Sequence, residues 1–355
     1  MKLIIEPDDG VSPLLSAIKS AKESIDLAIF RFDHHDLDKA LKDAVARGVK
    51  VAALVASVNH GGEKSLRKLE MRFLDAGITV ARSASGLSRY HDKVIVIDRR
   101  TLYVLSFNFT HLDIDHSRGF GIATHNSKWV AEAVKLLEAD SKRARYSCGL
   151  ETFVVSPVNA RKALGNFLKR AHKQLLIYDP KLSDKEMIRI LEDRAKAGVE
   201  IRAIGQAKAN LKVKKLSKLR LHTRTIIRDG RQAFIGSQSL RAAELDSRRE
   251  VGLIIRDAKI VKKLVDIFES DWTIGGKKIP PSNADKPKVP EKDSDKAAKI
   301  LIQELHPIAA TVRKAIKKAV AKAGDEVLED GSARDTVKEV VKKAVKQAVK
   351  EAAKN

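Results

Sequence analysis

A polar motif that occurs twice is the feature that most constrains the fold of this chain. The first copy, RYHDKVIVIDRRTLYVLSFNFT, begins at Arg89, and the second copy, RLHTRTIIRDGRQAFIGSQSL, begins at Arg220. Five polar positions recur at a constant distance of 131 residues (222 − 91). They are His91, Lys93, Asp98, Ser106 and Asn108 in the first copy, and His222, Arg224, Asp229, Ser237 and Ser239 in the second. Such agreement in register indicates an internal duplication.

The segments upstream of the two motifs share a second pattern. Residues 24–55 and 173–205 each read as an apolar strand, a polar loop, an amphipathic helix that ends at a glycine, and another apolar strand. This is the order of a βαβ unit. Gly48 and Gly198 are 150 residues apart (198 − 48), so the second copy is shorter, and the helix expected at residues 63–77 has no counterpart in it. The sequence therefore predicts an α/β fold with two pseudo-symmetric lobes, residues 1–147 and 148–274.

The residues after Trp272 differ from the rest of the chain, because no aromatic residue follows it. Residues 275–295 are rich in Pro, Gly and charge, which is typical of a flexible linker. In residues 296–355, Ala and Val recur at helical spacing between lysines, which predicts a basic amphipathic helical tail. Narrow Ala/Val stripes favour packing on each other, self-association with a second chain, or contact with a polyanion over deep membrane insertion.

The formal net charge of +23 and the pI of about 9.9 indicate a polyanionic partner. Nucleic acid, an anionic phospholipid or membrane surface, and phosphate-bearing substrates all fit. The single cysteine, Cys148, excludes an intrachain disulfide and a cysteine-rich zinc site. No stretch reaches the ~18 apolar residues of a membrane span, and the N-terminus does not resemble a signal peptide. We therefore expect a cytoplasmic protein, which is peripheral at the membrane if its partner is lipid.

The histidines and cations of the duplicated motif suit the chemistry of a phosphodiester. One histidine can attack phosphorus as a nucleophile while the other protonates the leaving oxygen. Lys93 and Arg224 would stabilise the charge that develops on the non-bridging oxygens. The side chains expected to bind the same phosphate are Ser106, Asn108, Ser237 and Ser239. This chemistry needs no metal and no other cofactor, and the sequence offers no acidic cluster with magnesium-like spacing.

The motif His-x-Lys-x4-Asp, followed by a Gly-Ser-x-Asn-like segment, resembles the HKD motif of the phospholipase D superfamily. That superfamily includes phospholipases D, cardiolipin and phosphatidylserine synthases, metal-independent nucleases and tyrosyl-DNA phosphodiesterases. The resemblance covers both copies of the motif, within about residues 1–274, and leaves the tail outside. It implies two α/β lobes with mixed sheets flanked by helices, motifs that meet at the junction of the lobes, and a two-step reaction through a phosphohistidine.

Three positions depart from the pattern of the superfamily. Leu105 stands where glycine is usual, and in the second copy Arg224 replaces lysine and Ser239 replaces asparagine. Arg224 keeps the positive charge but presents a planar fork, which changes how a phosphate can be held.

The resemblance also implies a carboxylate that hydrogen-bonds a catalytic histidine and fixes its tautomer. Glu250 has that place relative to His222 (250 − 222 = 28), whereas the matching place for His91 (91 + 28) holds Gly119. Asp113 and Asp115 are the alternative partners for His91. The usual order in the superfamily makes the first histidine the nucleophile and the second the general acid.

Other polar residues are explained without a chemical role. Asp98 and Asp229 lie at strand ends, where an aspartate typically anchors a turn. The adjacent His34 and His35 suggest a metal, but two neighbouring loop residues chelate poorly. Capping of the following helix by Asp33 or Asp36 is therefore favoured. The basic run at residues 208–220 leads to His222, and either a solvated face or contact with a polyanion explains it.

Three functions follow from these observations. Hydrolysis or transphosphatidylation of phospholipids ranks first, because the duplication is complete. A metal-independent nuclease ranks second, favoured by the charge and weakened by the few aromatic residues available for base stacking. A catalytically degenerate polyanion-binding protein ranks third, favoured by Leu105, Gly119 and Ser239.

Overall fold

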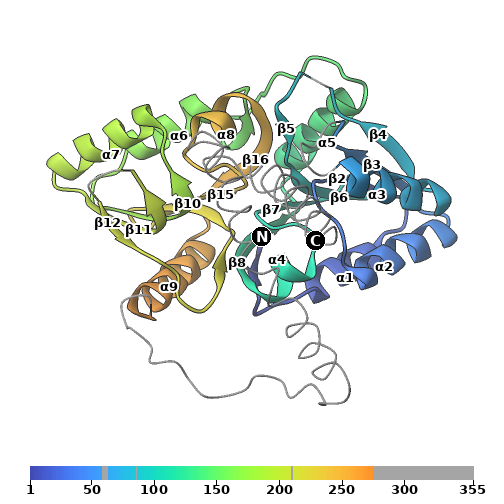
Figure 1. Cartoon of the computed structure of the whole chain (residues 1–355), viewed down its shortest axis with the longest axis horizontal. Helices are drawn as coiled ribbons and strands as arrows, with labels where there is room; N and C mark the ends of the chain where they lie inside the picture. The colour runs from blue at the N-terminus through green and yellow to red at the C-terminus, as the bar shows by residue number, and fades with distance from the viewer. Residues whose placement is uncertain (58–62, 85, 209–210, 275–355) are drawn as a thin grey trace, which may run out of the picture. The chain divides into compact units, whose positions relative to one another are not determined.

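The computed structural model describes residues 1–57, 63–84, 86–208 and 211–274. The predicted linker at residues 275–295 and the predicted tail at residues 296–355 lie outside these ranges. The described residues all belong to one compact unit, which contains both predicted lobes. Figure 1 shows the two sheets of this unit and the helices that cover them.

The first sheet consists mainly of strands from the first copy. Its order is β1-β8-β7-β6-β2-β3-β4, with the short strand β13 added beside β8. The strands are β1 (Lys2–Glu6), β2 (Ser24–Ile29), β3 (Lys50–Val55), β4 (Thr79–Arg82), β6 (Lys93–Ile97), β7 (Thr101–Leu105), β8 (Ser117–Thr124) and β13 (Arg220–Leu221). The β2-β3-β4 pairs are parallel and the other pairs along this path are antiparallel. The sheet is therefore mixed, as predicted.

The second sheet repeats this order, mainly with strands from the second copy. It runs β12-β11-β10-β14-β15-β16-β5, with β9 beside β16. The strands are β5 (Arg89–Tyr90), β9 (Phe153–Ser156), β10 (Gln174–Leu182), β11 (Glu200–Ala207), β12 (Lys212–Lys214), β14 (Arg224–Arg228), β15 (Gln232–Gly236) and β16 (Arg248–Ile255). Strand for strand, β9 to β16 occupy the places of the first-copy strands, which confirms the predicted pair of related lobes.

Helices flank both sheets. They are α1 (Ser12–Ser20), α2 (His35–Ala46), α3 (Glu63–Asp75), α4 (His111–Asp115), α5 (Ser127–Ser141), α6 (Ala160–Lys169), α7 (Lys185–Lys196), α8 (Ala242–Asp246) and α9 (Ala258–Ile274). In Figure 1, α6 and α7 lie on one face of the second sheet and α9 lies on the other. The helix predicted at residues 63–77 forms as α3, whereas the described residues between β11 and β13 hold the strand β12 and no helix.

The hydrophobic core extends from one lobe into the other. Phe120 and Leu136 of the first copy belong to the same buried cluster as Tyr178 and Phe268 of the second. The rings of Phe120 and Tyr178 meet edge to face, with centroids 5.6 Å apart. Each copy also has a cluster of its own, between its sheet and its outer helices. The shared cluster explains why the two lobes form one unit.

Two short strands cross between the lobes. β5 of the first copy pairs with β16 of the second, and β13 of the second copy pairs with β8 of the first. Buried ion pairs lie beside these crossings. Arg118 Nε is 3.0 Å from Asp271 Oδ2, and Arg249 Nη2 donates to Asp140 Oδ1 at 2.9 Å. Each of these pairs joins one copy to the other, and the two pairs are related by the same shift of 131 residues (249 − 118 and 271 − 140).

Candidate active site

The crossing strands bring the two motif histidines to the junction of the lobes. His91 follows β5, and its backbone N–H donates to the carbonyl oxygen of Arg249 at 2.9 Å. His222 follows β13, and its backbone N–H donates to the carbonyl oxygen of Arg118 at 3.2 Å. Each histidine is therefore fixed by the backbone of the opposite lobe. The resemblance to the superfamily implied this meeting of the two motifs.

A cavity of about 620 Å³ opens at this junction, and both histidines line it. Four arginines contribute to its wall: Arg31, Arg89, Arg220 and Arg224. Its apolar lining consists mainly of Phe30, Phe32, Leu66, Leu69, Leu112 and Leu221. The cavity is therefore a cationic site with an apolar side, which suits a ligand that joins a phosphate to a less polar group.

His91 is held by a carboxylate of the opposite lobe. Its Nδ1 lies 2.8 Å from Glu250 Oε2, and the Phe30 ring packs edge-on against the imidazole at 4.7 Å. The sequence assigned Glu250 to His222, and this assignment is wrong. β16 runs beside β5, so the residue that follows Arg249 faces the histidine of the first copy. No carboxylate is needed at Gly119, where a Cβ would lie 2.9 Å from Phe107 Cδ1.

Burial sets the protonation of this pair. It raises the pKa of Glu250 to about 8, with a smaller contribution from the negative charge of Glu244. Burial also lowers the pKa of His91 well below its ordinary value, and the charge of Lys93 adds to this effect. Both shifts disfavour charge, so near neutral pH a proton remains on the Glu250–His91 pair.

His222 has a different environment. Its Nε2 lies 3.5 Å from Asp113 Oδ2, and Asp113 also accepts hydrogen bonds from the backbone N–H and the side-chain amide of Asn108, at 2.8 and 2.7 Å. Asp113 was one of the expected partners of His91, but it lies next to His222. Burial lowers the pKa of His222 well below its ordinary value, and the charges of Arg224 and Arg220 lower it further.

The two motif cations make equivalent contacts. Lys93 Nζ donates to the carbonyl oxygen of His91 at 2.5 Å, and Arg224 Nη1 donates to that of His222 at 2.5 Å. Lys93 is 1% exposed and is not among the residues that line the cavity. Burial lowers its pKa to about 7, although the charge of Glu250 acts in the opposite direction. The ammonium group of Lys93 is therefore close to losing its proton at neutral pH.

Of the four side chains expected to bind phosphate, Asn108 lines the cavity. Ser106 and Ser237 directly follow β7 and β15, and their Oγ atoms accept from the backbone N–H groups of Phe120 at 2.9 Å and Val251 at 3.3 Å. Ser239 is 1% exposed and its N–H donates to Glu244 Oε2 at 2.7 Å. The structure therefore keeps Ser106, Ser237 and Ser239 out of the cavity wall and in hydrogen bonds that hold the strand ends.

Asp98 and Asp229 lie at the far ends of β6 and β14, where they organise the backbone. Asp98 accepts from the N–H groups of residues 22–24, at 2.7–3.2 Å. Asp229 accepts from residues 172–174 over the same range of distances. Both residues have positive φ, of 50° and 54°. These contacts agree with the turn-anchoring role that the sequence suggested.

Several residues of the site were not identified from the sequence. Glu244 is the counterpart of Asp113 (244 − 113 = 131), and Arg89 is the counterpart of Arg220, so the shift of 131 residues was the signal that could have found them. Arg31 has no such signal. Arg220 itself, from the basic run, reaches the cavity and pairs with Asp113. Arg220 therefore lines the cavity while its side chain stays 40% exposed to solvent.

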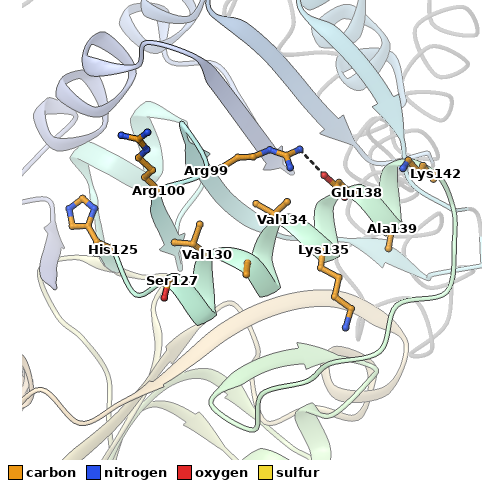
Figure 2. Close-up of a pocket in the computed structure, with 11 residues that line it drawn as sticks. Arg99, Arg100, His125, Ser127, Val130, Val134, Lys135, Glu138, Ala139 and Lys142 are labelled. Carbon is orange, nitrogen blue, oxygen red and sulfur yellow. Dashed lines mark hydrogen bonds and ion pairs between the residues drawn. The ribbon is translucent and has the colours of Figure 1, made fainter.

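A second hollow, of about 850 Å³, lies along α5 and is shown in Figure 2. Val130 and Val134 form part of its floor, and Arg99 donates to Glu138 at 2.7 Å on its edge. None of the site residues predicted from the sequence lines it. The junction cavity is smaller, but it holds both motif histidines, so we take it as the candidate active site.

Within the described ranges, no helix has both the length and the apolar character required to cross a membrane.

Comparisons with known proteins agree with the duplicated motif. The family described as "Cardiolipin synthase, PLD-like domain" matches residues 14–141 and 164–272. A polyphosphate kinase of Vibrio vulnificus is 25% identical over an alignment of 287 residues that covers 70% of this chain and 40% of that protein. A mitochondrial cardiolipin hydrolase of Homo sapiens is 29% identical over 127 residues, with 35% of this chain and 47% of that protein covered. A phospholipase D of Rickettsia bellii is 33% identical over 106 residues, with 29% of this chain and 50% of that protein covered. The chain thus spans half or less of the length of each of these relatives.

Solved structures show the same fold. The polyphosphate kinase from Porphyromonas gingivalis superposes with a TM-score of 0.61 at 24% identity, over 76% of this chain and 50% of that one. The phosphatidylserine synthase from Haemophilus influenzae superposes with a TM-score of 0.59 at 9% identity, over 77% and 86%. At these identities the comparison extends to the two-lobed architecture alone.

Proposed function

Because this chain belongs to the phospholipase D superfamily, we propose that it is a phosphodiesterase whose reaction takes place in the cavity lined by His91 and His222. The observation that carries the proposal is the geometry of that cavity. Two histidines from two copies of one motif share it, one backed by Glu250 and the other near Asp113. The proposed reaction is metal-independent and passes through a phosphohistidine.

In the proposed first step, His91 Nε2 attacks phosphorus. The contact of its Nδ1 with Glu250 favours this assignment, because a carboxylate that accepts from Nδ1–H leaves the lone pair on Nε2. The N–P bond forms as the bond from phosphorus to the leaving oxygen breaks. His222 gives its proton to that oxygen. A bound phosphate anion supplies the negative charge that raises the low pKa of His222 and so loads it with a proton.

In the proposed second step, water attacks the phosphohistidine. His222 takes a proton from this water, the N–P bond breaks, and His91 returns to its starting form. An alcohol in place of water gives transphosphatidylation by the same path. The guanidinium of Arg224 and the amide of Asn108 line the cavity where the non-bridging oxygens would lie, and they stabilise the charge of the five-coordinate phosphorus.

We propose a phospholipid as the substrate. The relatives named cardiolipin hydrolase and phospholipase D favour this class, and so does the apolar side of the cavity. Leu112 lines the cavity and is 52% exposed, so an apolar side chain stands where the cavity meets solvent. A phosphate among the arginines and a glycerol backbone against the leucines would use both sides.

A nuclease is the second candidate, and the four arginines of the cavity wall favour it. Arginine is well suited to phosphate through its planar fork of donors. A single phosphodiester needs few of these groups, whereas a strand of nucleic acid supplies several phosphates.

The test measures turnover by purified protein in EDTA. The substrates are vesicles of phosphatidylglycerol or cardiolipin, a bis-aryl phosphate, and single- and double-stranded DNA. We expect turnover of the bis-aryl phosphate and the vesicles, and loss of both by roughly 10²–10⁴-fold in His91→Ala and His222→Ala. Turnover of DNA in place of the vesicles would favour the nuclease. Near-full activity in either histidine variant would exclude the two-histidine mechanism.

A further inference from the structure

His34, His111 and Asp115 form a cluster outside the candidate active site. Each offers one ligand atom, and these atoms all lie within 4.8 Å of one another. The imidazole rings stack with centroids 4.2 Å apart, and His111 Nδ1 is 3.0 Å from Asp115 Oδ2. The sequence paired His34 with His35, which chelates poorly. The fold instead brings His34 to two residues of another segment.

Backbone contacts hold the two segments together. The N–H groups of Asp33 and His34 both donate to the carbonyl oxygen of Phe109, at 2.9 and 3.1 Å. Asp33 Oδ1 accepts from the N–H of His111 at 3.1 Å. The expected capping of α2 by Asp33 or Asp36 is therefore wrong, because His34 is the N-cap and no side chain caps the helix. Asp33 instead fixes the start of α4 beside His34.

The cluster has the donors and the access that a transition-metal ion needs. His111 and Asp115 are four residues apart in α4, so their side chains share one face. Their side chains are 58% and 43% exposed, so an ion can reach them from solvent. His34 is 4% exposed, and its Nδ1 has no hydrogen-bond partner. A buried imidazole nitrogen without a partner is costly unless something binds it.

We propose that His34, His111 and Asp115 bind a divalent transition-metal ion, with zinc as the probe. Zinc accepts histidine nitrogen and carboxylate oxygen at about 2.0–2.2 Å, so two ligand atoms of a tetrahedral site are about 3.3–3.5 Å apart. The ligand atoms now lie within 4.8 Å of one another. Small rotations of the exposed side chains of His111 and Asp115 would bring them to the tetrahedral separations. Water completes the fourth position.

The ion would act on the site through α4. That helix also carries Asp113, which lies next to His222 and holds Asn108. A metal that ties α4 to the residue preceding α2 would restrict the position of Asp113. The metal ion takes no part in the proposed phosphoryl transfer, so this inference is independent of the proposed function.

The experiment titrates untagged, EDTA-dialysed full-length protein with ZnCl2 by calorimetry, and with CoCl2 by visible absorption. We expect one ion per chain, a cobalt spectrum typical of four-coordination, and a rise in melting temperature with zinc. His111→Ala and Asp115→Asn should each weaken binding at least tenfold. Both side chains are exposed, so neither change should unfold the protein. His34→Gln should also weaken zinc binding at least tenfold. Because His34 is buried, circular dichroism checks that this variant still folds.

His35→Ala and His125→Ala serve as matched controls, because both remove an exposed histidine outside the cluster. They should leave the affinity and the stoichiometry unchanged. The proposal is overturned if the parent protein binds no stoichiometric ion. It is also overturned if His111→Ala and Asp115→Asn bind zinc as tightly as the parent, which would place the ion on other histidines.

Discussion

Two histidines of the same motif have different neighbours in this molecule. His91 contacts a carboxylate at hydrogen-bond distance, whereas the nearest carboxylate oxygen to His222 is 3.5 Å from its Nε2. The sequence identified both histidines and both cations from their register. It could not match Glu250 to the right histidine, because that match depends on which strands are neighbours across the junction. Spacing along the sequence can only match a carboxylate to the histidine of its own copy.

The first prediction concerns Glu250→Gln. Glutamine keeps the shape but presents an amide in place of the carboxylate, so the Nδ1–H tautomer of His91 is lost. We expect turnover to fall by roughly 10²–10⁴-fold at an unchanged melting temperature. In the parent, the carboxylate form exists above the pKa of about 8 and is lost as the pH falls. The parent rate should therefore decline on the acid side of pH 8, and the variant should lack this dependence.

Asp113→Asn is the companion variant, because Asp113 neighbours the proposed general acid. Its effect should be large for a poor leaving group and small for p-nitrophenol, which departs without a proton. Glu250→Gln should impair both substrates. If the two variants responded alike to the leaving group, the roles given to the two histidines would be incorrect.

The second prediction uses the pKa of Lys93, which burial lowers to about 7. An anion in the cavity raises this pKa, so binding takes up a proton. The affinity for tungstate, whose charge is constant near neutral pH, should be highest below pH 7. It should fall by up to about tenfold per pH unit as the pH rises above 7. Calorimetry in two buffers of different ionisation enthalpy measures the proton uptake. Lys93→Met should remove the proton uptake above pH 7. A tungstate affinity of the parent that does not change between pH 6 and 9 would contradict the prediction.

At the scale of elements, the repeated strand–helix–strand pattern predicted most of the architecture. Gly48 and Gly198 both adopt positive φ where the sequence expected helix ends, and α3 forms where the first copy had its extra segment. The crossing of β5 and β13 could not be predicted. Each is two residues long, so neither has a period to recognise, and their pairing is set by tertiary contacts.

The third prediction concerns the buried pair of Arg118 and Asp271. Asp271 also accepts from Tyr178 Oη at 2.7 Å. Asp271→Asn removes the buried counter-ion of the Arg118 guanidinium and leaves it the exposed Asp8, at 3.4 Å, as its ion-pair partner. We expect the free energy of unfolding to drop by about 3–5 kcal/mol, measured by urea denaturation. Glu138→Gln is the control, because the Arg99–Glu138 pair is 59% and 47% exposed. It should cost less than about 1 kcal/mol. Equal effects would show that the crossing does not depend on this pair.

At the scale of the whole molecule, one unit formed by both copies is joined in sequence to the predicted tail. The sequence predicted the two lobes. It could not show that they share a core, since the side chains that meet across the junction, such as Phe120 and Tyr178, are apolar residues like any others in their strands. The tail at residues 296–355 remains a prediction from periodicity and charge, as does self-association through it.

The fourth prediction is that truncation after Ile274 preserves the rate on a small soluble diester. The cavity residues that the structure describes all precede that point. Removal of the lysine-rich tail should weaken binding to anionic vesicles or DNA at ~50 mM salt, and the difference should shrink by ~200 mM salt. Cosedimentation with vesicles at several salt concentrations measures this. Equal binding by both forms at every salt concentration would show that the tail does not bind polyanions.

The most direct test of the account is to trap the covalent intermediate. The protein is mixed with a bis-aryl phosphate in EDTA, quenched within the first turnover and digested, and the peptides are sequenced by mass spectrometry. The account predicts a phosphoryl adduct on His91, absent in His91→Ala and longer-lived in His222→Ala, where the activation of water is lost. An adduct on His222 would reverse the roles of the two histidines, and turnover without any histidine adduct would contradict the mechanism.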